Sequence, residues 1–311
     1  MADTPRDDAL HLYERMYLIR AFEERIVKLF AEGDLFGTTH PCIGQEATAV
    51  GVIAALQPGD IVTSTHRGHG HFLAFTDDPA GLMAEIMGKA TGVCAGRGGS
   101  QHLHSENFYT NGITGGIQVV GTGMALAEKH KGSGRIVVSF LGEGALAQGV
   151  LHEAMNIASL WGLPILYAVE NNLYAMSTPV DDALAGGILE RAQALGITAR
   201  RVGNDGVFAV RDAAREACTE VRRTTRPFLL ELQTYRHRGH SINDQRPYRT
   251  REEEADWLAR DPLARLAKRI EPAQREAAEA RCHHRIERAV AEAHRAPVQN
   301  TGDIGTGLWT S

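Results

Sequence analysis

The sequence predicts an α/β fold in which helices cover both faces of a parallel sheet. Between about residues 60 and 240, short β-rich segments alternate with helical segments such as "QGVLHEAMNIASLW". This alternation is typical of a parallel sheet, because parallel strands need a crossover connection that is usually a helix. The chain can also build a substantial core, since 43% of its 311 residues are hydrophobic.

Three regions follow one another along the chain. We expect residues 1–60 to form an N-terminal helical segment, in which "LHLYERMYLIRAFEERIVKLF" repeats apolar residues every three or four positions and "CIGQEATAVGVIAAL" ends at Pro58 and Gly59. Residues 60–240 hold the predicted sheet, with strands in "RIVVSFLGE", "LPILYAVENN", "ITARRV" and "PFLLELQTYR". Residues 240–311 begin with the arginine-rich stretch "SINDQRPYRTREEEADW", so we expect a loop followed by a C-terminal helical tail.

Composition and charge exclude several classes of function. The formal net charge of −5 is scattered, so we expect no nucleic-acid partner. No stretch reaches the 18 or more apolar residues of a membrane span, and the N-terminus is acidic where a signal peptide would be basic. We therefore expect no membrane partner and a cytoplasmic location. The four cysteines form no CxxC pair, which favours reduced thiols over disulfides or a zinc ribbon.

The stretch "VVSFLGEGALAQG" places one acidic residue, Glu143, directly after an apolar strand. In an open α/β sheet, ligands bind outside the carboxyl ends of the strands, so Glu143 is a candidate site residue. Gly142 and Gly144 let the backbone approach a bound group closely, and the helix that begins near Gly149 offers free N–H groups to an anion. A lone Gly-Glu-Gly is more often a solvated turn.

The next strand also ends in polar residues, Asn171 and Asn172. Two neighbouring strand ends therefore supply a carboxylate and an amide oxygen about 30 residues apart in the sequence. Such an incomplete set of oxygen ligands suits Mg²⁺, which fills its octahedron with phosphate oxygens. This pairing favours a site over a solvated turn at Glu143.

Two other patterns suggest different ligands. The stretch "VVGTGMALAEKH" contains GxGxA, but no strand plainly precedes it and no ribose-binding acid follows at the expected distance, which argues against a nicotinamide cofactor. Five histidines lie close together in the sequence, and phosphate or loop contacts are favoured over zinc because their spacing is not that of a helical zinc motif. They are His66, His69, His71, His102 and His104.

"GEG" followed about 30 residues later by "NN" resembles the thiamine diphosphate motif. Seven stretches, in order, resemble the alpha subunit of the thiamine-dependent decarboxylating component of 2-oxo acid dehydrogenase complexes: "HPCIGQEA", "HRGHG", "GRGGSQHLH", "NGITGG", "GEGALAQG", "ENNLYAMSTP" and "YRHRGHSINDQRPYRTREE". The resemblance covers residues 10 to 295 and implies the thiamine diphosphate-binding fold. Glu143 resembles the branched-chain members and Glu170 the pyruvate-type members, which leaves the 2-oxo acid open.

The resemblance implies roles for individual residues. Glu143, the side chain of Asn172 and the carbonyl of Tyr174 would hold magnesium against the diphosphate. Arg67 would bind phosphate oxygens, and His66 stands where the family commonly has tyrosine. The remaining cofactor-binding residues would be Gly112 and Thr114 at the aminopyrimidine ring, and Gly142, Gly144 and Ala145 along the diphosphate. His240 and His40 would be catalytic, with His240 beside the cofactor and His40 nearer the substrate entrance.

The resemblance also implies the chemistry and the partners. Thiamine diphosphate supplies a carbon nucleophile that adds to a 2-oxo acid and an electron sink that accepts electrons as carbon dioxide leaves. The glutamate that activates the cofactor belongs to a beta subunit in this family, which implies an α2β2 heterotetramer and a lipoyl-bearing acyltransferase or other acyl carrier. The alternatives are an acetoin dehydrogenase or a transketolase-like transfer enzyme, and a non-catalytic subunit, against which the retained site residues argue.

Overall fold

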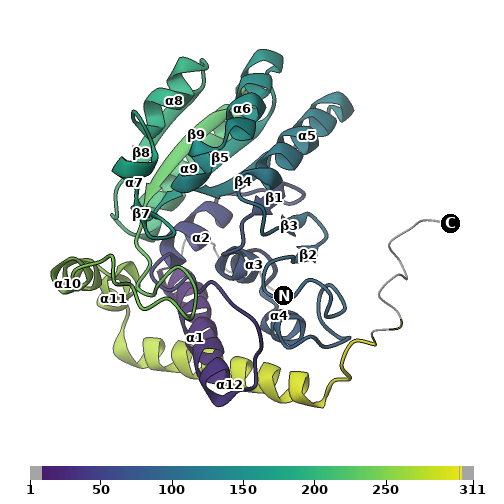
Figure 1. Ribbon diagram of the computed structural model, residues 1–311, viewed down its shortest axis with the longest axis vertical. Helices are drawn as coiled ribbons and strands as arrows, with labels where there is room; N and C mark the ends of the chain where they lie inside the picture. Colours follow the sequence, from purple (N-terminus) through teal and green to yellow (C-terminus); the bar gives the residue numbers. More distant parts are fainter. Residues whose placement is uncertain (1–8, 301, 303–311) are drawn as a thin grey trace.

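The computed structural model describes residues 9–300 and 302, which fold around one large sheet (Figure 1). Its seven strands lie in the order β2-β3-β1-β4-β5-β9-β8, and all pair in parallel except β2, which is antiparallel to β3. This confirms the predicted α/β class. The strands are β1 (Ile61–Ser64), β2 (His104–Ser105), β3 (Phe108–Thr110), β4 (Val137–Gly142), β5 (Ile165–Asn171), β8 (Thr198–Val202) and β9 (Phe228–Gln233).

The central strands β4 and β5 are buried on both faces, which explains their apolar sequences. Side chains alternate along each strand, so Val138 and Phe140 enter the core on one face while Val137 and Leu141 enter the core on the other. The register places Gly142 of β4 opposite Glu170 of β5. The residues that follow these two strands are therefore neighbours at one edge of the sheet.

Three helices cover one face of the sheet: α5 (Gly116–Lys131), α6 (Gly149–Trp161) and α8 (Ile188–Ala194) (Figure 1). Their buried residues, such as Ala125, Met155 and Ala192, pack against Ile165 and Tyr167 of β5. Beyond the ends of the strands lie the short elements η1 (Glu143–Ala147), β6 (Tyr174–Ala175), β7 (Thr178–Pro179) and α7 (Val180–Ala183).

The opposite face is covered by helices from both ends of the chain, in agreement with the predicted second layer. They are α1 (Ala9–Glu32), α2 (Glu46–Ile53), α3 (His69–Thr76), α4 (Pro79–Ile86), α9 (Val207–Thr224) and α11 (Pro262–Ala267), and α10 (Arg251–Ala259) connects the sheet to α11. Pro at the start of α4 and α11 suits a first helical turn, and Asp78 and Asp261 cap these helices.

The predicted C-terminal helix is α12 (Pro272–Arg295), which runs along the bottom of Figure 1 beside α1 and α4. Its buried residues recur every three or four positions and form one stripe: Ala278, Cys282, Ile286, Ala289, Val290 and Ala293. All four cysteines are free thiols, as expected. Within the described part of the chain, no helix is both long and apolar enough to cross a membrane.

The strand order creates a switch point beside β1. The chain passes from β1 to β3 on one side of it and then to β4 on the other side. Loops that leave neighbouring strands on opposite sides of such a point open a crevice at the carboxyl ends of the strands. The fold therefore positions the segments after β1, β3, β4 and β5 around one space.

Candidate active site

A cavity of about 430 Å³ lies at the carboxyl ends of β1, β3, β4, β5 and β9. All of the residues that the sequence analysis assigned to the site line this cavity, although their roles toward a cofactor stay predictions. They are His40, His66, Arg67, Gly112, Thr114, Gly142, Glu143, Gly144, Ala145, Asn172, Tyr174 and His240. The fold thus brings together segments that are up to 200 positions apart in the sequence.

One wall of the cavity carries an oxygen-rich group. Glu143 begins the 3-10 helix η1 and is buried, and the backbone N–H of Asn172 donates a hydrogen bond to its Oε2 at 3.1 Å. The Oδ1 atom of Asn172 is buried without a hydrogen-bond partner. Burial raises the pKa of Glu143, because the ionised carboxylate has lost water. An orphaned amide oxygen beside a desolvated carboxylate fits a hard cation.

The backbone at Gly144 is pressed against the turn that follows β5. A Cβ at this position would lie 2.7 Å from the Cβ of Ala175, which no side chain tolerates without movement. Glycine therefore allows η1 and the β6 strand to approach each other beside the cavity. Two features would suit a diphosphate here. The backbone at Gly144 carries no side chain that would keep a ligand away, and Oδ1 of Asn172 has no hydrogen-bond partner in the protein.

Two buried guanidinium groups, from Arg67 and Arg236, give the cavity its positive charge. Arg67 follows β1 and donates to the carbonyl oxygens of Pro41 at 2.7 Å and of His240 at 2.9 Å. Arg236 follows β9 and donates to the carbonyl oxygen of Met176 at 2.8 Å. Burial lowers the pKa of both arginines, and the pKa of Arg236 falls to about 9 because Arg67 adds repulsion.

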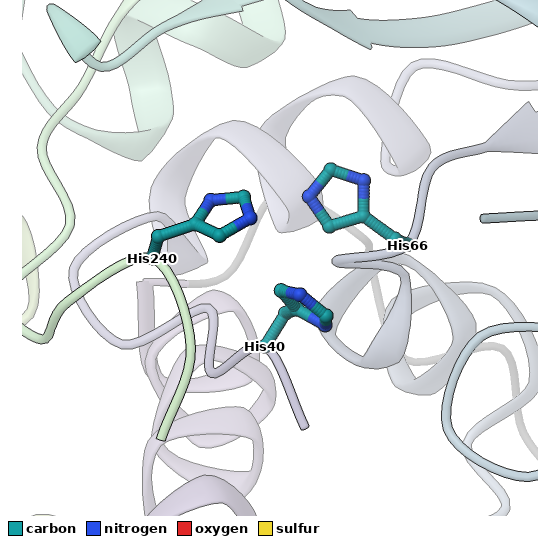
Figure 2. Close-up of side chains that lie close together, drawn as sticks. All are labelled: His40, His66 and His240. Carbon is teal, nitrogen blue, oxygen red and sulfur yellow. The ribbon is translucent and has the colours of Figure 1, made fainter. Parts of the chain in front are cut away.

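Three histidines meet between these arginines, and Figure 2 shows that they come from three separate segments. The ring centroids of His40 are 4.7 Å from His66 and 4.9 Å from His240, and those of His66 and His240 are 5.3 Å apart. Burial lowers their pKa values, with repulsion by Arg67 next, to about 3 for His40, about 2 for His66 and about 4 for His240. All three rings are therefore uncharged at neutral pH.

The five neighbouring histidines of the sequence do not form one cluster. His69 contacts Glu23 at 3.0 Å and Ser100 at 2.9 Å, and the Nδ1 atom of His71 lies 2.8 Å from the hydroxyl of Ser64. Among the described residues, one group of three side chains is close enough to hold a metal ion, and it consists of His40, His66 and His240. Of the five neighbouring histidines, this group includes His66 and no other. His69 and His71 both lie in α3 and contact side chains of other segments, and the expected preference for phosphate or loop contacts over zinc stays a prediction.

Several lining residues were missed by the sequence prediction of the site. Arg236 was given no role at the site, although its position at the end of the stretch "PFLLELQTYR" was a usable signal. Glu170 is held by the hydroxyl of Thr48 and lies 3.4 Å from Nε2 of His71. Gln101 approaches Nδ1 of His40 at 3.3 Å, and it lies in the stretch "GRGGSQHLH", to which the sequence analysis gave no role at the site. The other missed residues are Gln45, Thr65, Asn111, Ile113, Gly115, Ile117, Gln118, Ala175 and Met176.

The glycine-rich stretch before Gln101 wraps around a carboxylate of the protein itself. Buried Glu85 of α4 accepts hydrogen bonds from four backbone N–H groups, those of Cys94 at 2.7 Å, Gly96 at 2.9 Å, Gly98 at 2.7 Å and Gly99 at 3.0 Å. Closely spaced backbone N–H groups that point at one acceptor form a concave anion site. Here the anion is Glu85, so the stretch serves to fix the loop that carries Gln101.

The loop after β9 is tied to the turn after β5. The guanidinium of Arg249 lies over the rings of Tyr174, Tyr235 and Tyr248, with its Cζ atom 4.9, 4.4 and 5.5 Å from their centroids. The hydroxyl groups of Tyr174 and Tyr235 both donate to Glu253, at 2.7 and 2.6 Å. These contacts hold the segment with His240 against the cavity.

The strand ends of the sheet enclose a polar cavity that contains a desolvated carboxylate and two arginines. This arrangement defines an α/β protein with an anion site at the carboxyl edge of the sheet. Residues 14–301 match the family described as Dehydrogenase E1 component, and the chain belongs to this family. This agrees with the resemblance seen in the sequence motifs.

Characterised relatives cover most of the chain. The alpha subunit of acetoin:2,6-dichlorophenolindophenol oxidoreductase from Bacillus subtilis is 39% identical over 98% of this chain and 94% of its own length. The pyruvate dehydrogenase E1 component alpha subunit from Zymomonas mobilis is 44% identical over 85% of this chain and 76% of its own length. The subunit of the same name from Rhizobium meliloti is 40% identical over 87% of this chain and 79% of its own length.

Proposed function

We propose that this chain is the alpha subunit of a thiamine diphosphate-dependent dehydrogenase that decarboxylates a 2-oxo acid and passes on its acyl group. The observation that carries the proposal is the buried, unpartnered Oδ1 of Asn172 beside Glu143, in a cavity that is also lined by Arg67 and Arg236. A divalent cation that bridges to a diphosphate would satisfy both sides of this arrangement. The family match and the names of the relatives support the same function.

Each part of the cavity then has a role. Glu143, Oδ1 of Asn172 and the carbonyl of Tyr174 would hold Mg²⁺, and the backbone at Gly144 and Ala145 would contact the diphosphate. Arg67 and Arg236 would neutralise its negative charge, since arginine suits charge-assisted bonds to phosphate. The segment of Gly112 and Thr114, which follows β3, would meet the aminopyrimidine ring.

When bound, thiamine diphosphate supplies the carbon nucleophile and the electron sink for decarboxylation. The chain contributes position and a polar environment. His40 and His240 are neutral because burial and the arginines disfavour imidazolium, so each of them can donate a hydrogen bond without carrying charge. They line the cavity with His66, at the end where the acyl donor would enter.

The carboxylates that line the cavity indicate that a partner subunit is needed. Its described lining contains two, Glu143 and Glu170, and Glu170 is already bonded to Thr48 and beside His71. We therefore assign the carboxylate that activates the cofactor to a beta subunit, in an α2β2 heterotetramer located in the cytoplasm. A lipoyl-bearing acyltransferase would receive the acyl group.

Acetoin cleavage is the second candidate function. It is favoured by the relative from Bacillus subtilis, whose name specifies acetoin and which matches 98% of this chain. The two candidates separate when the chain is co-expressed with its beta subunit and assayed on 2-oxo acids and acetoin with an artificial electron acceptor. We expect turnover by the complex and none by the isolated chain, and turnover by the homogeneous isolated chain would contradict the proposal.

Removal of the orphaned oxygen should weaken the Mg²⁺-dependent binding of the cofactor. We expect Asn172→Ala to weaken thiamine diphosphate binding at least about tenfold in the presence of Mg²⁺, because one of the few protein ligands of the ion is lost. Calorimetry on the assembled complex, with Mg²⁺ or with excess chelator, measures this. Asn156→Ala, at an exposed position of α6, is the matched control.

The same calorimetry also measures how cofactor binding depends on pH. Since burial raises the pKa of Glu143, its carboxylate takes up a proton at a higher pH than an ordinary glutamate does. Protonation removes the charge that attracts the cation, so the Mg²⁺-dependent affinity should fall as the pH is lowered from neutral. Equal affinity in chelator, or normal binding by Asn172→Ala, would show that these residues do not hold a metal.

A further inference from the structure

A chain of hydrogen bonds that the proposed function does not use joins Glu23 of α1, His69 of α3 and Ser100 of the glycine-rich loop. Nδ1 of His69 lies 3.0 Å from Oε1 of Glu23, and Nε2 of His69 lies 2.9 Å from the hydroxyl oxygen of Ser100. Glu23 and His69 are fully buried, and Ser100 is half-buried. None of these three belongs to the described residues that line the cavity at the strand ends.

The surroundings of Glu23 set the direction of both hydrogen bonds. Its Oε1 also accepts from the backbone N–H and from the thiol of Cys42, at 3.4 and 3.2 Å, so this oxygen is an acceptor. Nδ1 of His69 therefore carries the hydrogen and donates to Glu23. When the imidazole is neutral, Nε2 then holds a lone pair that accepts the hydroxyl hydrogen of Ser100. A general base needs this arrangement toward a serine nucleophile.

The imidazole and the hydroxyl are held by separate parts of the fold. His69 is the first residue of α3, and its ring packs edge-on against Phe22, with the ring centroids 6.4 Å apart. Ser100 directly follows Gly99, whose backbone N–H donates to Glu85 at 3.0 Å. Since both groups are already positioned, a reaction between them needs little further ordering of the chain.

Ser100 lines a second cavity, of about 250 Å³, in which another polar side chain lacks a partner. Thr39 lines the same cavity and is 2% exposed, and its hydroxyl oxygen has no hydrogen-bond partner. Buried polar groups are almost always paired, so this hydroxyl suits a ligand that accepts a hydrogen bond. Phe36 and Ile86 give the cavity an apolar part, which suits a short acyl chain.

We propose that Ser100 is the nucleophile of a second site, which takes a short acyl group from an activated ester or thioester. His69 is its general base, and Glu23 is the positioning residue that orients His69. The site acts without thiamine diphosphate and therefore goes beyond the proposed function.

The reaction has two halves. In the first, Oγ of Ser100 attacks the carbonyl carbon and its proton passes to Nε2 of His69, while the hydroxyl of Thr39 donates to the carbonyl oxygen as that oxygen gains negative charge. The bond to the alkoxide or thiolate then breaks, and this leaving group takes the proton from Nε2. In the second half, water attacks the acyl-serine by the same route, which releases a carboxylic acid and restores Ser100. The carboxylate of Glu23 stabilises the positive charge that His69 carries between the two proton transfers.

Covalent labelling of the full chain tests the nucleophile directly. Diisopropyl fluorophosphate transfers its phosphoryl group to an activated serine and releases fluoride, and mass spectrometry of the digested chain locates the adduct. We expect an adduct on Ser100, which Ser100→Ala abolishes. Ser177→Ala, at an exposed position between β6 and β7, should be labelled like wild type. Wild-type chain without an adduct on Ser100 would overturn the proposal.

Release of p-nitrophenol from p-nitrophenyl acetate measures the rate at which Ser100 is acylated. His69→Gln keeps a side chain that can pair with Glu23 but removes the base, and we expect it to slow acylation at least about hundredfold. Thr39→Val removes the unpaired hydroxyl with little change in volume and should slow acylation at least about tenfold. Circular dichroism checks that each variant is folded. An unchanged rate in a folded variant would overturn the role given to that residue.

The role of Glu23 is tested through the hydrogen on His69. In a chain labelled with ¹⁵N at histidine, with the ring assigned by His69→Gln, we expect hydrogen on Nδ1 and a lone pair on Nε2. Glu23→Gln offers an uncharged acceptor, so the signal of the Nδ1 hydrogen should move to higher field and acylation should slow at least about tenfold. Glu24→Gln makes the same change at the next, exposed position of α1 and should alter neither.

Hydrogen on Nε2 of His69, or an unchanged acylation rate in Glu23→Gln, would overturn the role of Glu23. None of these measurements requires thiamine diphosphate, so their outcome does not depend on the proposed function.

Discussion

Burial of three imidazole rings beside two arginines makes the stability of the chain depend on pH. In the unfolded chain a histidine has a pKa near 6.5, whereas His66 in the folded chain has a pKa of about 2. Between these values the unfolded state binds more protons, so acid favours unfolding. Stability is therefore fully present above about pH 6.5 and is lost as the pH falls below it.

Replacement of His66 should remove part of this acid sensitivity. We expect wild-type chain to lose stability between pH 7 and pH 5, and His66→Phe to lose about 1 to 2 kcal/mol less over the same range, because one titrating group is gone. Urea unfolding at both pH values measures the difference. His284→Phe, at an exposed position of α12, should behave like wild type. Identical losses in wild type and His66→Phe would show that His66 is not kept neutral by the fold.

At the scale of elements, α4 and the glycine-rich loop are joined through one carboxylate. Glu85 accepts four backbone hydrogen bonds, so its replacement leaves several N–H groups without an acceptor. We expect Glu85→Gln to lower the free energy of unfolding by about 2 to 4 kcal/mol, since an amide offers one neutral acceptor and opposes the N–H groups with its own donors.

Urea unfolding and limited trypsin digestion measure this effect together. Exposed Arg97 lies inside the loop, so a loosened loop should be cut faster after that residue. The control is Glu276→Gln, at an exposed position of α12 that carries the same chemical change. Unchanged stability with unchanged cleavage would mean that the loop holds its shape without Glu85.

The elements also show how much of the fold and of the candidate site could be predicted from the sequence. The strands β4, β5, β8 and β9 were predicted, and the strand-end rule then placed Glu143 and Asn172 at one edge of the sheet. Strands β1 and β3 have only four and three residues and were not predicted, because so short a pattern carries no clear period. The segments after β1 and β3 were therefore assigned to the site through family resemblance alone. No local pattern marks the role of Glu85. Gln101 lies in one of the stretches that carry the family resemblance, but its contact with His40 joins segments 61 positions apart and could not be read from that stretch.

At the scale of the whole molecule, the three predicted regions share one core. Residues of α1, of the sheet and of α12 belong to the same buried cluster, so the N-terminal and C-terminal helices stabilise the layer beneath the cavity. The division at residues 60 and 240 stays a prediction about the organisation of the sequence. A shared core explains why the segment with His40 and the segment with His240 can meet Arg67 in fixed positions.

The face formed by α5 and α6 is apolar and exposed, in contrast to the rest of the surface that these helices present. Val120 of α5 is 48% exposed and Trp161 of α6 is 49% exposed, and a groove of about 230 Å³ runs between the two helices. Ile113, which is 68% exposed, lies beside this face and also lines the cavity. A subunit that covers the face would therefore reach the site, as the proposed beta subunit must.

A charge on this face should prevent assembly without unfolding the chain. We expect Val120→Glu to weaken association with the beta subunit at least about tenfold, because an unpaired carboxylate would be buried at an apolar interface. Co-purification and analytical ultracentrifugation measure association, and circular dichroism checks the fold. Val298→Glu, at an exposed apolar residue outside the α5 and α6 face, should assemble normally. Normal assembly of Val120→Glu would place the beta subunit elsewhere. If the variant loses both its association with the beta subunit and its affinity for thiamine diphosphate, the partner completes the cavity from this side.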